Sequence, residues 1–117
     1  MMMNRPPLLD DQCVTTMRRL KLLDRLYPAF IAELPQRLAA LRAAITAVDR
    51  SEIRQIAHRL RGSAAQLGAA ALARALREIE EAAIDEASGL ELADAGLEEL
   101  ARATVAALQR ELSANSR

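Results

Sequence analysis

The chain has 117 residues, a formal net charge of zero, one histidine and one cysteine, and aromatic residues make up 2% of it. This length is enough for one domain with a hydrophobic core and hardly enough for two. A single cysteine excludes an internal disulfide, and one cysteine with one histidine cannot form a Cys/His zinc site. The neutral charge and the scarcity of aromatic side chains argue against a nucleic-acid-binding protein. No apolar run is long enough for a membrane span and no signal peptide is evident, so we expect a cytoplasmic protein without a membrane partner.

Alanine and leucine dominate the composition and favour helices, while no segment alternates apolar and polar residues as a strand would. The sequence therefore predicts an all-α fold. Short connections make neighbouring helices antiparallel, so we expect an up-down-up-down four-helix bundle with a short extra N-terminal helix. We expect one domain over residues 8–113, frayed ends at 1–7 and 114–117, and a monomer, since the closed bundle leaves no large apolar stripe exposed.

The first predicted helix is short and covers about residues 11–20, with Asp10 as its N-cap. The second covers about residues 23–48, where apolar residues recur every three or four positions and mark one helical face. Pro28 and Pro35 interrupt this pattern. Because each proline removes a backbone donor, we expect a helix boundary or a kink there. The apolar face of this helix is expected to comprise Leu26, Phe30, Leu34, Leu38, Leu41, Ile45 and Val48.

Three further helices are predicted, and each has a plausible start or stop signal. The third is expected over about residues 51–67, after a break at 49–51 that offers good N-cap residues. Gly68 should end it, because glycine adopts a left-handed backbone at little cost. The fourth is expected over about residues 70–87 and the fifth over about 94–113. Their inward-facing residues are predicted to be Leu72, Leu76, Ile79, Ala83, Leu97, Leu100, Ala101, Thr104, Leu108 and Leu112.

His58 is predicted to lie on the solvent side of the third helix. At about 100° per residue it points roughly 150° away from the centre of the apolar arc. Its neighbours one turn away are Arg54, Arg61 and Gly62, and Ala65 follows one turn later. Glycine in a helix costs about 0.5–1 kcal/mol relative to alanine, and its missing side chain leaves open space beside the imidazole. The pattern fits an ordinary surface histidine, or a nucleophile that a bulky partner approaches closely.

The segment IAHRLRGSAAQLGA, residues 56–69, resembles the core motif of histidine-containing phosphotransfer (HPt) domains. That motif reads Ala-His, any residue, an aliphatic residue, Lys, Gly, a small residue, Ala, and then an aliphatic-Gly-Ala step. The resemblance extends over about residues 8–112. Arg61 stands where the family usually has lysine, and Arg59 adds a further cation. Because lysine is a compact charge and arginine a planar fork, partner preference is the property that this departure puts in doubt.

The resemblance implies a role in a two-component phosphorelay. His58 would accept a phosphoryl group from the aspartyl phosphate of a response-regulator receiver domain and pass it to another receiver. Arg61 would stabilise the phosphoryl oxygens, while Gly62 and Ala65 would leave space for docking. Further candidates for orienting the ring or contacting the partner are Gln66, Arg54 and Arg59.

The same resemblance implies how the work is divided between the partners. The receiver would supply Mg²⁺ and most catalytic groups, so we expect this chain to bind no metal or cofactor and to be a phosphocarrier rather than an enzyme. Its expected partners are receiver domains and a (hybrid) histidine kinase.

An acidic stretch without lysine or arginine follows the basic segment around His58. We interpret it as a solvated helix face and the loop after it, because such runs usually have that structure. A single histidine preceded by Gln55 excludes the Glu-x-x-His pairs of a carboxylate-bridged di-metal site. Cys13 is interpreted as a small packing residue. The acidic residues of the stretch are Glu78, Glu80, Glu81, Asp85, Glu86, Glu91, Asp94, Glu98 and Glu99.

Two other functions compete with the phosphorelay. The dimerisation helices of histidine kinases have an acidic residue directly after the histidine and a proline soon after it, whereas Arg59 follows His58 here. The chain also has no glycine-rich nucleotide-binding segment, so we expect no autokinase activity. The alternative that stays open is an HPt-like interaction module that docks a receiver or kinase without carrying phosphate, although the presence of His58, Arg61 and Gly62 argues against it.

Overall fold

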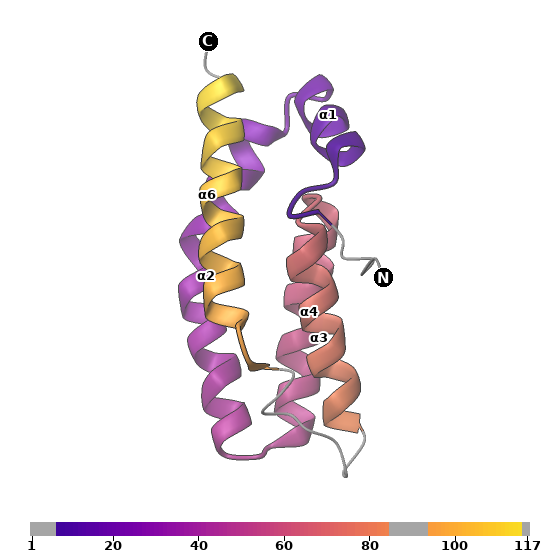
Figure 1. The fold of residues 1–117 in the computed structure, drawn as a ribbon, viewed down its shortest axis with the longest axis vertical. Coiled ribbons are helices and arrows are strands. Elements are labelled where there is room, and N and C mark those ends of the chain that lie inside the picture. Colours follow the sequence, from indigo (N-terminus) through magenta and orange to yellow (C-terminus); the bar gives the residue numbers. More distant parts are fainter. Residues whose placement is uncertain (1–6, 85–93, 116–117) are drawn as a thin grey trace, which may run out of the picture.

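The computed structural model describes residues 7–84 and 94–115. Within these ranges the four long helices form an antiparallel bundle in the cyclic order α2, α3, α4, α6, and α1 lies at one end (Figure 1). The predicted all-α four-helix bundle with a short N-terminal helix is therefore confirmed. In the described part of the chain, no helix combines the length and the apolar character needed to cross a membrane. The helices are α1 (Asp11–Arg19), α2 (Leu23–Thr46), α3 (Arg50–Gln66), α4 (Ala70–Ile84) and α6 (Leu97–Asn115).

Aspartate side chains cap two of these helices. The Asp10 carboxylate accepts the backbone N–H groups of Gln12 and Cys13 at 2.9 and 3.2 Å, as predicted. In the break before α3, Asp49 accepts the amide of Glu52 at 3.2 Å. These bonds satisfy backbone donors that have no partner within the helix, and they fix where α1 and α3 begin.

Pro28 and Pro35 do not end α2. The helix continues through both residues, so of the predicted boundary or kink the boundary is excluded. Both prolines are exposed, so water can bond the carbonyl groups that lose their amide partners. A proline on the solvent side of a long, well-packed helix can therefore be tolerated.

The end of α2 also differs from the prediction. The periodicity places Val48 on the buried face, but the helix ends at Thr46 and Val48 is 59% exposed. Val48 lies in the turn with φ of 53°, a left-handed conformation in which the helical register no longer applies. This prediction is therefore wrong.

The core is formed by the predicted faces of all four long helices, Val48 excepted. The buried Tyr27 hydroxyl donates to the carbonyl of Leu67 at 3.2 Å and so joins α2 to the end of α3. Burial, with smaller contributions from Cys13 and Glu111, raises the pKa of Tyr27 to about 12. The largest fully buried side chains are Tyr27, Leu23, Leu34, Leu41, Ile53, Leu60, Leu72, Leu76, Ile79, Leu108 and Thr104.

Gly68 ends α3, as predicted, and also allows α1 to pack there. Its φ is +82°, and a Cβ at this position would lie 2.9 Å from the Cβ of Cys13. The Asp10 amide donates to the Gly68 carbonyl at 2.7 Å. Burial and then the nearby Asp10 charge raise the pKa of the Cys13 thiol, which suits a packing residue better than a reactive one. Any larger residue at Gly68 would therefore push α1 away from the bundle.

The last helix is shifted towards the C-terminus relative to the prediction. It begins at Leu97 rather than at residue 94, after Gly96 with φ of +81°. It ends at Asn115, two residues beyond the predicted end. The Asn115 side chain accepts from Arg18 Nε and donates to Asp24, both at 3.1 Å, so contacts with α1 and α2 hold the last turn.

Some predictions fall outside the described residues. These are the fraying of residues 1–6, 116 and 117, the end of the fourth helix at residue 87, and the acidic residues Asp85, Glu86 and Glu91.

Candidate functional site

His58 lies in the middle of α3, on the side that faces away from the core. Its neighbours Ala57 and Leu60 are buried, whereas the His58 side chain is 63% exposed. The helical-wheel prediction of an imidazole that points to solvent is confirmed. The buried residues on either side fix the position of the backbone that carries this ring.

Glu80, on α4, contacts the ring, and the sequence-based interpretation missed it. Its Oε2 lies 2.8 Å from His58 Nδ1, and its Oε1 accepts from Arg61 Nε at 3.0 Å. The Glu80 side chain is only 20% exposed, so the prediction of a solvated acidic face is wrong at this position. The available signal was its place directly after the buried Ile79, which puts Glu80 at the edge of the α4 core face.

The contact with Glu80 determines which nitrogen of His58 carries the proton in the neutral ring. An ionised carboxylate only accepts hydrogen bonds, so Nδ1 must carry the proton that it donates to Glu80. The Arg61 Nη2 atom is also 3.0 Å from Nδ1, but a guanidinium only donates, and Nδ1 cannot donate to Glu80 and accept from Arg61 at once. We assign the Nδ1–H tautomer because Arg61 already bonds the same carboxylate through Nε. The lone pair is then on Nε2.

Arg61 therefore lies on the Nδ1 side of the ring, together with Glu80. Its side chain is 33% exposed, and its ion pair with Glu80 restrains the carboxylate that orients the imidazole. The local surface is thus less basic than the sequence suggested, because one carboxylate bonds both the arginine and the histidine. Stabilisation of phosphoryl oxygens by Arg61 stays a prediction.

Gly62 and Ala65 form a bare strip on α3 beside the histidine. A Cβ added at Gly62 would meet no heavy atom within 4 Å, so the space that the sequence predicted there is open. Ala65 is exposed one turn further along the helix. Packing within the chain does not require the glycine, which leaves its use in docking as a prediction.

The other candidate residues are spread along α3. Arg54 and Arg59 are exposed and line the same hollow as His58. Gln66 lies two turns beyond the histidine, at the end of α3, where its backbone carbonyl accepts from the Cys13 thiol at 3.3 Å. The contacts at the ring come instead from Glu80 and Arg61. Among residues 7–84 and 94–115, no group of three His, Cys, Asp or Glu side chains is placed to hold a metal ion.

The hollow beside His58 has a volume of about 500 Å³ and lies between the first half of α3 and the second half of α4. It is shallow and open, as a surface for a protein partner would be. Its lining residues are Ser51, Arg54, Gln55, His58, Arg59, Glu80 and Ile84.

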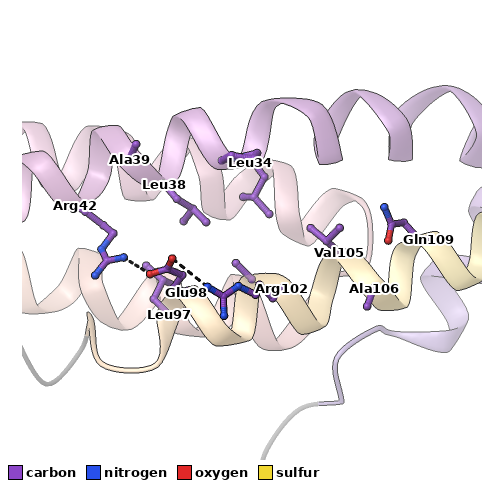
Figure 2. Close-up of a pocket in the computed structure, with 12 residues that line it drawn as sticks. Leu34, Leu38, Ala39, Arg42, Leu97, Glu98, Arg102, Val105, Ala106 and Gln109 are labelled. Carbon is purple, nitrogen blue, oxygen red and sulfur yellow. Dashed lines mark hydrogen bonds and ion pairs between the residues drawn. The ribbon is translucent and has the colours of Figure 1, made fainter.

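A second depression, of about 520 Å³, lies on another face of the bundle, between α2 and α6 (Figure 2). Apolar side chains such as Leu38 and Val105 form its walls, and the ion pairs of Glu98 with Arg42 and Arg102 close one end. It contains neither His58 nor either partner of the ring. We refer to it as the α2–α6 groove.

Comparison with known proteins agrees with this geometry. A family model described as the Hpt domain matches residues 25–114. The chain belongs to the Hpt-domain family. The fold of this HPt domain is also similar to the crystal structure of histidine-containing phosphotransfer protein B (HptB) from Pseudomonas aeruginosa PAO1. The TM-score is 0.82 at 26% identity, and the match covers 90% of this chain and 94% of that chain. A comparison with curated protein sequences gave no match.

HPt domains are phosphocarrier modules of phosphorelays that interact with receiver domains and histidine kinases. The family assignment therefore makes this chain a histidine phosphotransfer module. His58 is the single histidine of the chain, and it lies on the surface of the bundle.

Proposed function

We propose that His58 accepts a phosphoryl group on Nε2 from the aspartyl phosphate of a receiver domain and then passes it to the aspartate of another receiver. The observation that carries this proposal is the exposed ring whose Nδ1 is bound to Glu80 at 2.8 Å. That contact leaves the nucleophilic lone pair on the other nitrogen. The open surface at Gly62 supports docking of a partner at this side of α3.

The proposed transfer changes few bonds and charges on this chain. The Nε2 lone pair forms the N–P bond, the aspartyl O–P bond breaks, and the electron pair stays on the receiver carboxylate. The phosphorylated ring keeps its Nδ1–H and becomes more positive, which strengthens the bond to the Glu80 carboxylate. The reverse transfer to a second receiver follows the same path, so Glu80 serves both directions.

The receiver would contribute the groups that this chain does not. We expect it to supply Mg²⁺ and to neutralise the charge on the transferred phosphoryl group, while Arg61 holds Glu80 and adds positive charge nearby. A histidine kinase, hybrid or not, would supply the phosphate at the start of the relay. This division predicts that the chain alone does not incorporate phosphate from ATP.

The proposal is tested by transfer from a labelled receiver. Receiver domains from a panel are phosphorylated with [³²P]acetyl phosphate, freed of the donor, and mixed with the wild-type chain or the His58→Gln variant. We expect acid-labile, alkali-stable label on the wild type and none on the variant. Because the chain has one histidine, phosphohistidine in the wild type can only be at His58.

Other outcomes would overturn the proposal. Equal labelling of His58→Gln would place the phosphate elsewhere. Binding of receivers without labelling of the wild type would favour the pure interaction module. Incorporation of phosphate from ATP alone would contradict the absence of autokinase activity.

A further inference from the structure

Three large apolar side chains are strongly exposed in the described part of the chain, and one of them shares a hollow with His58. Leu20, Val48 and Ile84 are 57%, 59% and 63% exposed. Leu20 follows α1 and Val48 lies in the turn before α3, whereas Ile84 lines the hollow that contains the imidazole. Because His58 and Ile84 line the same hollow, a partner that docks over this hollow next to the ring can bury Ile84.

Ile84 is held in a fixed relation to the site. It lies four residues after Glu80 on α4, so the two side chains are on the same face of this helix, one turn apart. Glu80 is in turn bonded to His58 and Arg61. The apolar side chain and the nucleophile are therefore connected through packed helices, and docking on one positions the other.

The charged residues that line the hollow favour a partner with an acidic surface. Arg54 and Arg59 line the hollow from α3 and are exposed. A surface that combines cationic groups with one protruding isoleucine fits a protein that carries acidic residues around a phosphoryl group and an apolar residue beside them. A receiver domain with its phosphorylated aspartate has this acidic character.

We propose that the receiver docks across both α3 and α4, with Ile84 as its apolar anchor and with Arg54 and Arg59 facing its acidic residues. The receiver then covers the hollow between the first half of α3 and the second half of α4. This inference rests on the proposed phosphotransfer and adds the contact that would determine affinity for the receiver. Contacts buried at the centre of an interface contribute most to binding, and a single isoleucine beside the reacting ring is in such a place.

The test compares Ile84→Ser with the matched controls Leu20→Ser and Val48→Ser, which remove an apolar side chain of similar exposure elsewhere. Transfer is measured with the labelled receiver at increasing concentration. We expect Ile84→Ser to raise KM about tenfold at unchanged kcat, because burial of the side chain on docking is lost. The two controls should stay within about twofold of the wild type.

A second measurement locates the surface directly. Amide chemical shifts of the ¹⁵N-labelled chain are followed while the beryllofluoride-activated receiver is added. Changes around residue 84 and in the first half of α3 would support the proposal, and changes confined to the other faces would overturn it. An unchanged KM for Ile84→Ser, or an equal effect of Val48→Ser, would also overturn it while leaving the phosphotransfer to His58 intact. Equal labelling of His58→Gln would instead refute the function on which it rests.

Discussion

The hollow beside His58 and the α2–α6 groove are of nearly equal volume, about 500 and 520 Å³, but their linings differ. The groove is lined mainly by aliphatic residues, as ligand pockets commonly are. The hollow is open, contains the imidazole and is lined mainly by charged or polar residues, whose alkyl parts also face it. Apolar enclosure therefore does not locate the chemistry of this bundle. In the proposed function a ring with one nitrogen held by a carboxylate locates it, because the receiver would bring most of the catalytic groups.

Each region contains one glutamate whose carboxylate bonds two other side chains. These two glutamates differ in how far they are buried. Glu80 bridges His58 and Arg61 and is 20% exposed, whereas Glu98 bridges Arg42 and Arg102 and is 57% exposed. Exposed ion pairs contribute about 0–1 kcal/mol, because water and salt screen them. The less exposed Glu80 has a defined geometry at Nδ1 and can therefore determine a tautomer.

The strongest test of this comparison removes each bridging carboxylate. Glu80→Ala should slow transfer from a receiver to His58 by about ten- to a hundredfold, the range seen when a residue that orients a functional histidine is lost. Glu98→Ala, the matched control in the α2–α6 groove, should change the rate less than about twofold. Glu80→Gln should lie between them, because its amide oxygen still accepts from Nδ1–H.

The same variants reveal the nitrogen that reacts. ³¹P NMR of the phosphorylated wild type should show phosphate on Nε2 of His58. The Glu80→Ala variant should be phosphorylated more slowly, and part of its phosphate should be on Nδ1. Equal rates of phosphotransfer for Glu80→Ala and Glu98→Ala would show that the two glutamates do not differ in function. The assignment of a tautomer-fixing role to Glu80 would then be wrong.

The second test fills the open strip beside the histidine. Gly62→Gln removes a helix-destabilising glycine, so the free energy of unfolding should stay equal or rise by up to about 1 kcal/mol. Transfer should nevertheless slow about fivefold, since an overlap that costs about 1 kcal/mol in the docked complex has that effect on the rate. Ala39→Gln, on the groove side, should leave transfer unchanged. A Gly62→Gln protein that transfers at the wild-type rate would show that the partner does not approach this strip.

Most of the fold could be predicted from the sequence because its core residues recur every three or four positions, as they do on one face of a helix. The stripes of α3 and α4, the cap at Asp10 and the stop at Gly68 are local signals, and all are confirmed. The outcome differs where tertiary context decides. The boundary expected at Pro28 or Pro35 is absent, Val48 falls outside the helical register, and the last helix runs to Asn115, which side chains from α1 and α2 contact.

In the candidate site, too, the features of a single helix could be predicted from the sequence, whereas a contact between two helices could not. The exposure of His58 and the open space at Gly62 follow from the geometry of a single helix, so the sequence was sufficient for them. Glu80 is 22 residues from His58 and on another helix, and its contact depends on how α3 packs against α4. Nothing in the local sequence distinguishes Glu80 from the other residues of the acidic stretch as the one that bonds a histidine.

The smallest expected effect concerns the groove itself. Leu38 is half-buried in its wall (Figure 2), and Leu38→Ala should lower the free energy of unfolding by about 1 kcal/mol, less than the loss at a fully buried leucine. Urea unfolding followed by circular dichroism measures this change, and transfer from the labelled receiver should stay at the wild-type rate. A loss of transfer without a matching loss of stability would mean that a partner also uses the α2–α6 groove. The hollow beside His58 and the α2–α6 groove would then both take part in docking the partner.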